Sequence, residues 1–191
     1  MEKLAGELEL VRRFQNGGHS AFGAIMAHYE PYVLGLLTRM APNRAQAEDL
    51  CQETFLKVLK GLHRFRGSSE LKTWIFRVAH NVALDSFRSS EGKADSLDAL
   101  TEDGMQDPAA HGPLPSDNID EGAMRQAVEK ALGNLPPTQR EVLHLLYWEE
   151  LSVADIAKVL DIPEGTVKTH LFRGRKALRR DAALLLAGGA S

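Results

Sequence analysis

The 191-residue sequence contains one cysteine and few aromatic residues, which make up 6% of the chain. A single cysteine, Cys51, excludes an internal disulfide framework and favours a protein of the reducing cytoplasm. No run of 18 apolar residues occurs, so the sequence has no candidate transmembrane helix. The first residues, MEKLAGELELVRRF, follow a charged helical pattern and lack the apolar core of a signal peptide. We therefore expect a cytoplasmic protein with no membrane insertion.

The usual motifs of metal, nucleotide and nucleophile chemistry are also missing. The seven histidines are scattered, with no His-x-x-x-His pair and no Cys-x-x-Cys pair, which excludes the common zinc-binding spacings. The sequence has no Gly-Lys-Ser/Thr phosphate loop and no Gly-x-Ser-x-Gly nucleophile elbow. We therefore expect that the protein is not an enzyme and that it binds no metal or cofactor.

The formal net charge of −3 is unevenly distributed along the chain. Residues 89–120 contain one basic residue against eight acidic residues, a balance of −7, whereas residues 1–88 have a balance of +3. Residues 121–191 have a balance of +1, with most of their cations at or after Lys168. The phosphates of a nucleic acid respond to such local charge rather than to the total. An acidic total therefore does not exclude a DNA-binding protein.

Apolar residues recur at helical spacing over most of the chain, which predicts an all-α fold. We expect helices over residues 20–40, 44–65 and 70–89, with Asn43 capping the second and Pro31 kinking or restarting the first. Three helices with short joints predict a compact bundle. Helices resume near Glu121, and a face made of Val142, Leu143, Leu146 and Tyr147 is predicted to be core.

Residues 91–120 differ in composition from the rest of the chain. They contain three prolines, three glycines, eight acidic residues and no aromatic residue. Such a segment cannot bury enough apolar surface to offset its ordering entropy, so we predict a flexible acidic linker. The expected architecture is two small helical domains, an N-terminal helical bundle over residues 1–90 and a C-terminal helix-turn-helix domain over residues 121–186.

The helix-turn-helix pattern lies between Leu151 and Arg180. Ser152 can cap a first short helix, Pro163 disfavours helix in the residue before it, and a second helix starts near Glu164. Val167, Leu171, Gly174 and Leu178 share one face of the second helix. The outward positions include Lys168, Thr169, Phe172, Arg173, Arg175 and Lys176. A second helix with cations on its free face is the layout that enters a DNA major groove.

Two further patterns precede the linker. Asp49, Gln52, Glu53 and Leu56 share one helix face, which predicts either a docking surface for a basic partner helix or an ordinary solvated face. The next stretch interleaves cations with aromatic and polar residues: Arg64, Phe65, Arg66, Lys72, Trp74, Arg77, His80, Asn81 and Arg88. This mixture suits unpaired DNA, because bases stack on rings and the backbone attracts cations. Trp74 itself is expected in the core, and Cys51 is expected to be a small buried residue.

Three stretches together resemble the bacterial extracytoplasmic-function (ECF) sigma factors, which are promoter-specificity subunits of RNA polymerase. They are AEDLCQETFLKVLKGLHRFRG (47–67), ELKTWIFRVAHNVALDSFR (70–88) and LPPTQREVLHLLYWEELSVADIAKVLDIPEGTVKTHLFRGRKALRR (135–180). The first two are similar to the family's region 2, and the third to its region 4. The resemblance implies a sigma factor that binds core RNA polymerase and directs transcription initiation at −35 and −10 promoter elements.

The same resemblance implies roles for individual residues. The contacts to the clamp helices of the largest polymerase subunit would be Asp49, Gln52 and Glu53, and region 4 would meet the flap region. The contacts to the −10 element would be Phe65, Arg66, Ser68, Lys72, Arg77 and Asn81. The contacts to the −35 element would be Thr166, Lys168, Thr169, Phe172, Arg173 and Lys176. An anti-sigma partner, which could hold the protein at the inner membrane, is also implied.

A response-regulator-type transcription factor is the main alternative, because its C-terminal helix-turn-helix is similar to the stretch EGTVKTHL. That class needs an upstream receiver or ligand domain with parallel strands and a phospho-acceptor aspartate. Residues 1–88 have neither pattern, so the sigma factor remains the favoured interpretation.

Overall fold

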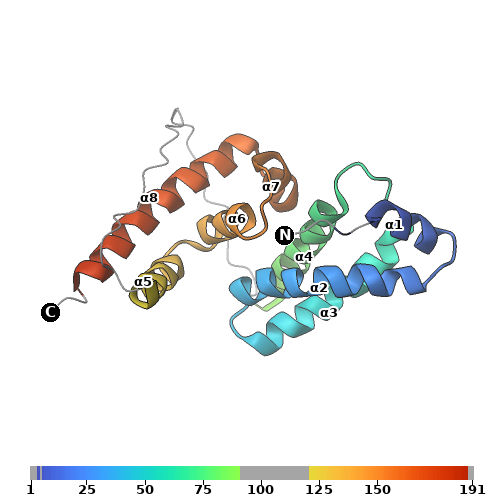
Figure 1. Cartoon of the computed structure of the whole chain (residues 1–191), viewed down its shortest axis with the longest axis horizontal. Helices are drawn as coiled ribbons and strands as arrows, with labels where there is room; N and C mark the ends of the chain where they lie inside the picture. The colour runs from blue at the N-terminus through green and yellow to red at the C-terminus, as the bar shows by residue number, and fades with distance from the viewer. Residues whose placement is uncertain (1–3, 5, 91–120, 189–191) are drawn as a thin grey trace.

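The computed structural model describes residue 4, residues 6–90 and residues 121–188. The predicted linker over residues 91–120 lies outside the described residues. Eight helices and no strand occur in the described part, which confirms the predicted all-α class (Figure 1). Among the described residues, no helix is both long enough and apolar enough to cross a membrane.

The N-terminal helix group consists of α1 (Glu7–Gln15), α2 (Ser20–Met40), α3 (Arg44–Leu62) and α4 (Leu71–Ser90). Helix α2 is central, because it packs against each of the other three. Its buried face includes Ile25, Tyr29 and Leu37, and α4 contributes Phe76 to the same core. The helix runs through Pro31 without a restart, and the proline lies on its exposed side.

Two polar contacts attach α1 to this bundle. The buried Tyr29 hydroxyl donates to the Glu7 carboxylate at 2.6 Å, and burial together with this contact raises the pKa of Tyr29 above its ordinary value. The Gln15 amide nitrogen donates to the carbonyl oxygens of Leu62 and Phe65 at 3.0 and 2.9 Å. The second contact fixes the chain where it leaves α3, so α1 supports the loop between α3 and α4.

The boundaries of α3 agree with the prediction at one end only. The Asn43 side chain accepts a hydrogen bond from the Gln46 backbone N–H at 2.9 Å, which confirms the predicted cap. The helix ends at Leu62 rather than at Phe65, and Gly67 has a left-handed φ of 73°. A glycine tolerates that conformation because it has no Cβ, so the chain can turn toward α4 here.

The C-terminal helix group consists of α5 (Glu121–Gly133), α6 (Pro137–Tyr147), α7 (Val153–Leu160) and α8 (Glu164–Gly188). Helix α8 packs against the other three. Val142 and Leu143 are buried as predicted, and Leu146 is partly buried. Tyr147 is 57% exposed, so its prediction as a core residue was wrong. Its ring instead lies beneath the Arg175 guanidinium, 5.6 Å from the ring centroid.

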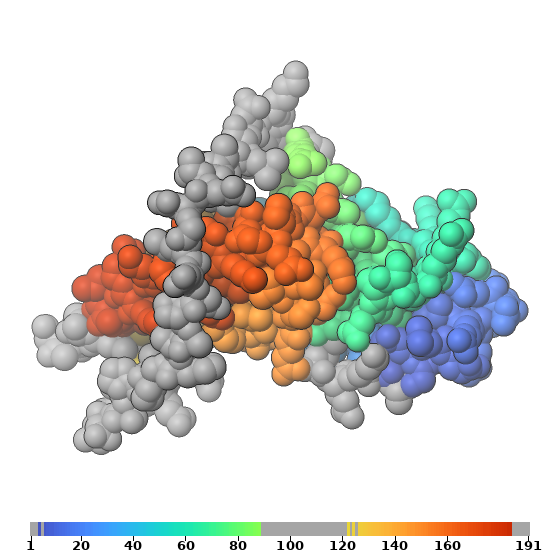
Figure 2. All heavy atoms as spheres, turned by 90° about the horizontal axis from the view of Figure 1, so that it is seen from above, coloured from blue at the N-terminus to red at the C-terminus, as the bar shows by residue number. Residues whose placement is uncertain are grey.

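The two helix groups are in contact. Helix α4 packs against α7, and α2 packs against α6. Figure 2 shows the atoms of the C-terminal group directly against those of α4. The sequence predicted two domains but not that they pack against each other. Hydrogen bonds between the two groups join residues more than 60 positions apart, which local sequence patterns do not reveal.

We predict that Gly61→Ala destabilises the N-terminal group. A Cβ at Gly61 would lie 2.9 Å from a ring atom of Trp74, and that ring is itself packed against Phe65 with centroids 5.3 Å apart. Overpacking of this kind outweighs the better helix propensity of alanine, so the free energy of unfolding should fall by about 1–2 kcal/mol. Gly23→Ala is the control, because its Cβ would meet nothing within 4 Å. Urea denaturation should show unchanged or higher stability for the control.

We also predict that Ser152→Ala destabilises α7. The Ser152 hydroxyl oxygen accepts a hydrogen bond from the Asp155 N–H at 3.1 Å, which caps the helix. Loss of such a cap lowers the free energy of unfolding by about 1 kcal/mol. Ser152→Thr keeps the hydroxyl and should stay near the wild type in the same denaturation experiment. Equal losses for both variants would contradict the capping role.

Candidate nucleic-acid interface

Local capping interactions fix the helix-turn-helix formed by α7 and α8. The Ser152 hydroxyl caps α7 and also donates to the Asp155 carboxylate at 2.6 Å. Burial opposes the charge on Asp155, but its hydrogen bonds with Ser152 and Lys158 outweigh burial and lower its pKa. Asp161 ends α7 in the left-handed conformation with φ 55°. This residue turns the chain, so α8 starts at Glu164 as predicted.

The buried side of α8 matches the predicted core face at Val167, Leu171 and Gly174, whereas Leu178 is only partly buried. Val167 is fully buried, Leu171 is 4% exposed, and a Cβ at Gly174 would lie 3.0 Å from Leu143. A glycine at this position therefore allows α6 and α8 to approach closely. The approach sets which side of α8 faces away from the protein.

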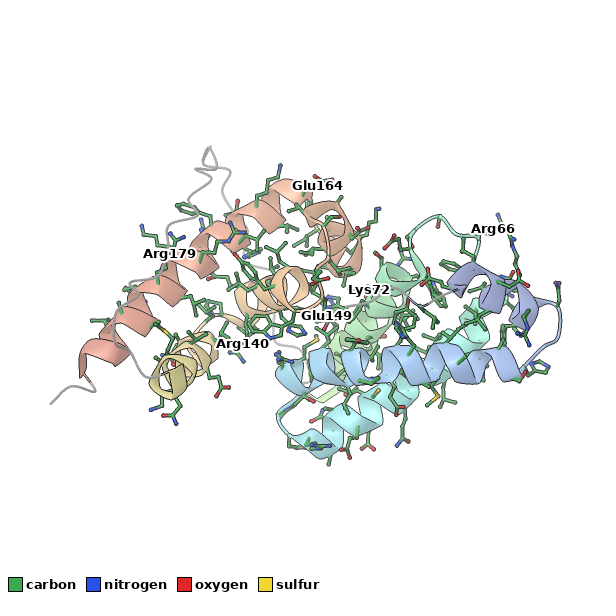
Figure 3. The ribbon with its side chains drawn as sticks, viewed as in Figure 1. Arg66, Lys72, Arg140, Glu149, Glu164 and Arg179 are labelled. Carbon is green, nitrogen blue, oxygen red and sulfur yellow. The ribbon has the colours of Figure 1, made fainter. Side chains whose placement is uncertain are left out.

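The six residues predicted for the −35 element lie on the remaining surface of α8. Lys168, Arg173 and Lys176 are exposed, whereas Thr166, Thr169 and Phe172 are partly buried. The Thr169 hydroxyl donates to the Gly165 carbonyl at 3.0 Å, which leaves the lone pairs of its oxygen able to accept hydrogen bonds. Figure 3 shows this helix on the outer side of the C-terminal group, with Glu164 and Arg179 marking its course.

Two other side chains of α8, Arg175 and His170, are less accessible to a DNA partner. Arg175 is partly buried and stacks over the Tyr147 ring, so the predicted outward position is only partly free. His170 is also partly buried, and burial together with the nearby Arg173 charge lowers its pKa. The cations exposed on the described part of α8 near its start are therefore Lys168, Arg173 and Lys176.

The acidic face of α3 is open to solvent. Asp49, Gln52 and Glu53 are exposed, and Leu56 is 57% exposed beside them. Glu53 forms an ion pair with Lys57 at 3.1 Å, one turn further along the helix. Leu59 is also 36% exposed. The face thus combines two carboxylates with apolar surface, a composition suited to a protein partner.

Cys51 lies on the opposite side of α3. Its thiol is 5% exposed, and burial raises its pKa to about 11. The prediction that it is a small buried residue is confirmed.

The six residues predicted for the −10 element fall into two sets. Arg66, Ser68, Arg77 and Asn81 are exposed on α4 and the loop before it, and Figure 3 shows Arg66 directed away from the protein. Phe65 and Lys72 are each 9% exposed. The Phe65 ring packs against Trp74, so it lies in the core rather than on a surface where a base could stack.

Lys72 is buried between the two helix groups. Its ammonium group donates to the Glu149 carbonyl oxygen in the connection between α6 and α7, and it lies 5.7 Å from the Phe76 ring centroid. Burial lowers the pKa of Lys72, although nearby carboxylates oppose that shift. In Figure 3 the labels of Lys72 and Glu149 adjoin where the groups meet.

Further polar residues in this contact were not found by sequence reasoning. The His80 ring nitrogen Nδ1 lies 2.7 Å from a Glu141 carboxylate oxygen, and both side chains are about nine-tenths buried. The Arg39 guanidinium lies 5.6 Å from the centroid of the Trp148 ring. No local motif marks such pairs, since only the tertiary structure brings them together. In the described ranges, no group of three potential ligands could hold a metal ion.

Both helix groups match known protein regions. Residues 25–92 match the family described as Sigma-70 region 2, and residues 125–178 match Sigma-70, region 4. The first match covers α2 to α4, which carry the acidic face and the predicted −10 residues. The second covers α6, α7 and the part of α8 that carries the exposed cations.

Similar proteins span nearly the whole chain. The RNA polymerase sigma-H factor of Pseudomonas aeruginosa is 31% identical over 182 residues, which cover 93% of this chain and 94% of that protein. The ECF RNA polymerase sigma factor SigW of Bacillus subtilis is also 31% identical, over 89% of this chain and 93% of its own length. The sigma factor RpoE of Bartonella quintana, solved with the anti-sigma factor NepR, is 25% identical. The structural match covers 84% of this chain and 95% of the Bartonella chain, with a TM-score of 0.60.

The chain contains two sigma-70 regions in the family's order, and its fold is all-helical. Relatives of this identity match it over nearly its whole length, so these observations lead to one conclusion. The chain belongs to the ECF sigma factors, the promoter-recognition subunits of bacterial RNA polymerase.

Proposed function

We propose that this sigma factor divides promoter recognition between its two helix groups. Residues 121–186 read the −35 element as duplex DNA, with Thr166, Lys168, Thr169, Phe172, Arg173 and Lys176 as the contacts. The observation that carries the proposal is the surface of α8, where exposed cations alternate with partly buried hydroxyl and aromatic side chains. Lysine and arginine can donate to guanine O6 and N7, and an aromatic ring can touch a thymine methyl group.

Residues 1–90 open and hold the −10 element in this proposal. Arg66 and Ser68 lie on an exposed loop, and Arg77 and Asn81 follow on the exposed side of α4. Such a surface can attract the backbone of an unpaired strand and hydrogen-bond to a base turned out of its stack. Phe65 and Lys72 can join only if their surroundings rearrange, because each is 9% exposed.

The polymerase contact is proposed at the acidic face of α3. Asp49, Gln52 and Glu53 would meet basic residues of the clamp helices, and the exposed Leu56 supplies apolar area. Complementary charge favours a fast and specific encounter, while apolar area favours a longer residence time. Region 4 would make a second contact with the flap region. The protein acts in this scheme as an initiation factor without catalysis of its own.

An anti-sigma partner is proposed for the free protein. The solved Bartonella relative was determined in complex with one. A partner anchored in the inner membrane would hold this otherwise cytoplasmic protein at that membrane until a signal releases it.

Run-off transcription tests the proposed function. Purified core polymerase is incubated with fragments of the source genome, with and without the protein. We expect discrete start sites that appear only when the protein is present, each preceded by shared −35 and −10 sequences. Absence of new start sites, together with a shift of duplex DNA by the protein alone, would instead indicate a transcription factor that acts without polymerase.

We predict that Arg173→Ala weakens use of these promoters through particular bases. An arginine that reads base edges contributes about 1–3 kcal/mol, and its loss relaxes specificity at the position it reads. Promoter variants with single base changes in the −35 element should show this loss in run-off assays. Arg180→Ala is the control, because Arg180 is exposed and paired with Asp181 at 2.7 Å. An equal effect of Arg173→Ala on every DNA sequence would make the residue a phosphate contact.

A further inference from the structure

An exposed tyrosine at the end of α6 meets an arginine of α8. Tyr147 is 57% exposed, and the guanidinium carbon of Arg175 lies over its ring, 5.6 Å from the ring centroid. Arg175 is partly buried. The contact joins α6 to the side of α8 at the surface of the C-terminal group, outside its apolar core.

The close approach of α6 and α8 brings these two residues together. The helices lie side by side, and a Cβ at Gly174 would be 3.0 Å from a side-chain carbon of Leu143 (Figure 1). Tyr147 lies four positions after Leu143, and residues at that spacing share one side of a helix. Arg175 follows Gly174 directly. The glycine therefore places the Arg175 side chain against the last turn of α6.

Arg175 lies at the border between the buried side of α8 and its proposed DNA face. Leu171 and Gly174 are buried, whereas Lys168 and Phe172 are proposed contacts to the −35 element. Lys168, Phe172 and Arg175 form one row along the helix, because residues three, four and seven positions apart share a side. Side chains in a helix lean toward its N-terminus, so the Arg175 guanidinium is directed toward the Phe172 end of the row.

A border position of this kind is suited to the DNA backbone. A helix in the major groove has a sugar-phosphate backbone on either side of it. Side chains in the middle of the exposed face reach base edges, and side chains at its borders reach phosphates. A cation at the border adds affinity for any sequence.

The Arg175 guanidinium is held in a way that leaves its hydrogen-bond donors available. Stacking on an aromatic ring uses the flat face of a guanidinium, whereas its N–H groups point outward in the plane. The Nε of Arg175 is buried and has no hydrogen-bond partner in the described ranges. An arginine fixed by its face can present two parallel N–H groups to the oxygens of a phosphate.

We propose that Tyr147 is a positioning residue for promoter binding, whose ring holds the Arg175 guanidinium toward a DNA phosphate beside the −35 element. The proposal rests on the proposed −35 role of α8 and adds two residues to it. A side chain that is ordered in advance loses less entropy when it binds. Because a phosphate contact carries no sequence information, this pair should set affinity and register rather than base preference.

Tyr147→Leu is the central test variant, and Tyr147→Phe is its matched control. Leucine keeps apolar bulk but has no aromatic face, whereas phenylalanine keeps the face and loses only the hydroxyl. Arg175→Ala removes the proposed phosphate contact itself, and the double variant completes a cycle that measures the coupling of the two residues. Thermal unfolding of the free proteins establishes that each variant is folded. Tyr147→Ala takes the place of Tyr147→Leu if leucine is not tolerated.

The measurement is binding of a fluorescent promoter fragment by holoenzyme at several salt concentrations. The holoenzyme is formed from core polymerase and each variant, and the fragment is one that directs a start site in the run-off assay. Loss of a phosphate contact makes affinity less dependent on salt, so Arg175→Ala should lower the slope of log affinity against log salt by about 1. Tyr147→Leu should weaken binding about 2- to 5-fold, the range of an exposed cation–π contact. Tyr147→Phe should match the wild type.

Two comparisons distinguish positioning from a purely structural role. In the Arg175→Ala background, Tyr147→Leu should have no further effect, because the ring then has no guanidinium to hold. Across single-base variants of the −35 element, the loss caused by Tyr147→Leu should be uniform, unlike the base-dependent loss expected for Arg173→Ala. Independent losses in the double variant would overturn the positioning role, and so would a loss in Tyr147→Phe equal to that in Tyr147→Leu.

The same data separate failure of this proposal from failure of the proposed function. An unchanged salt slope in Arg175→Ala would overturn the phosphate contact, while specific promoter binding by the wild-type holoenzyme would leave the proposed function standing. If the wild-type holoenzyme shows no promoter-specific binding, the proposed function fails and the role of Tyr147 fails with it.

Discussion

The limited size of each helix group is the constraint on which the rest of this structure depends. Four short helices form one core, and each helix can bury only the face that points toward it. Helix α2 is the centre of one group and α8 packs against every other helix of the second. The opposite faces of α3 and α8 consequently remain on the surface. These outer helix faces are therefore surfaces that partners can bind.

Charge differs between the two outer faces. The face of α3 presents Asp49 and Glu53, with the apolar Leu56 beside them. The face of α8 presents Lys168, Arg173 and Lys176. One surface therefore favours basic protein partners and the other favours phosphates, although the chain as a whole has a net charge of −3. Separation of these surfaces on different helix groups allows a protein partner and DNA to bind at the same time.

Polar side chains connect parts of the structure that apolar packing leaves apart. Glu7 and Gln15 attach α1 to the bundle and support the chain that leaves α3. Polar pairs also join the two helix groups, His80 with Glu141 and Lys72 with the Glu149 carbonyl, beside apolar residues of one buried cluster that includes members of both groups.

The sequence by itself determined the helices and the chemistry of their exposed faces. The N-caps Asn43 and Ser152 were predicted correctly because a cap depends on residues three positions apart, and the buried side of α8 followed from helical periodicity. The end of α3 and the exposure of Tyr147 were not predicted, since both depend on packing by other helices. Only the tertiary structure decided that Lys72 is covered by Glu149 and that His80 meets Glu141. Lys72 and Glu149 lie 77 positions apart in the sequence, and His80 and Glu141 lie 61 positions apart. The residues near each of them in the sequence therefore do not indicate which surface of the other helix group they will contact.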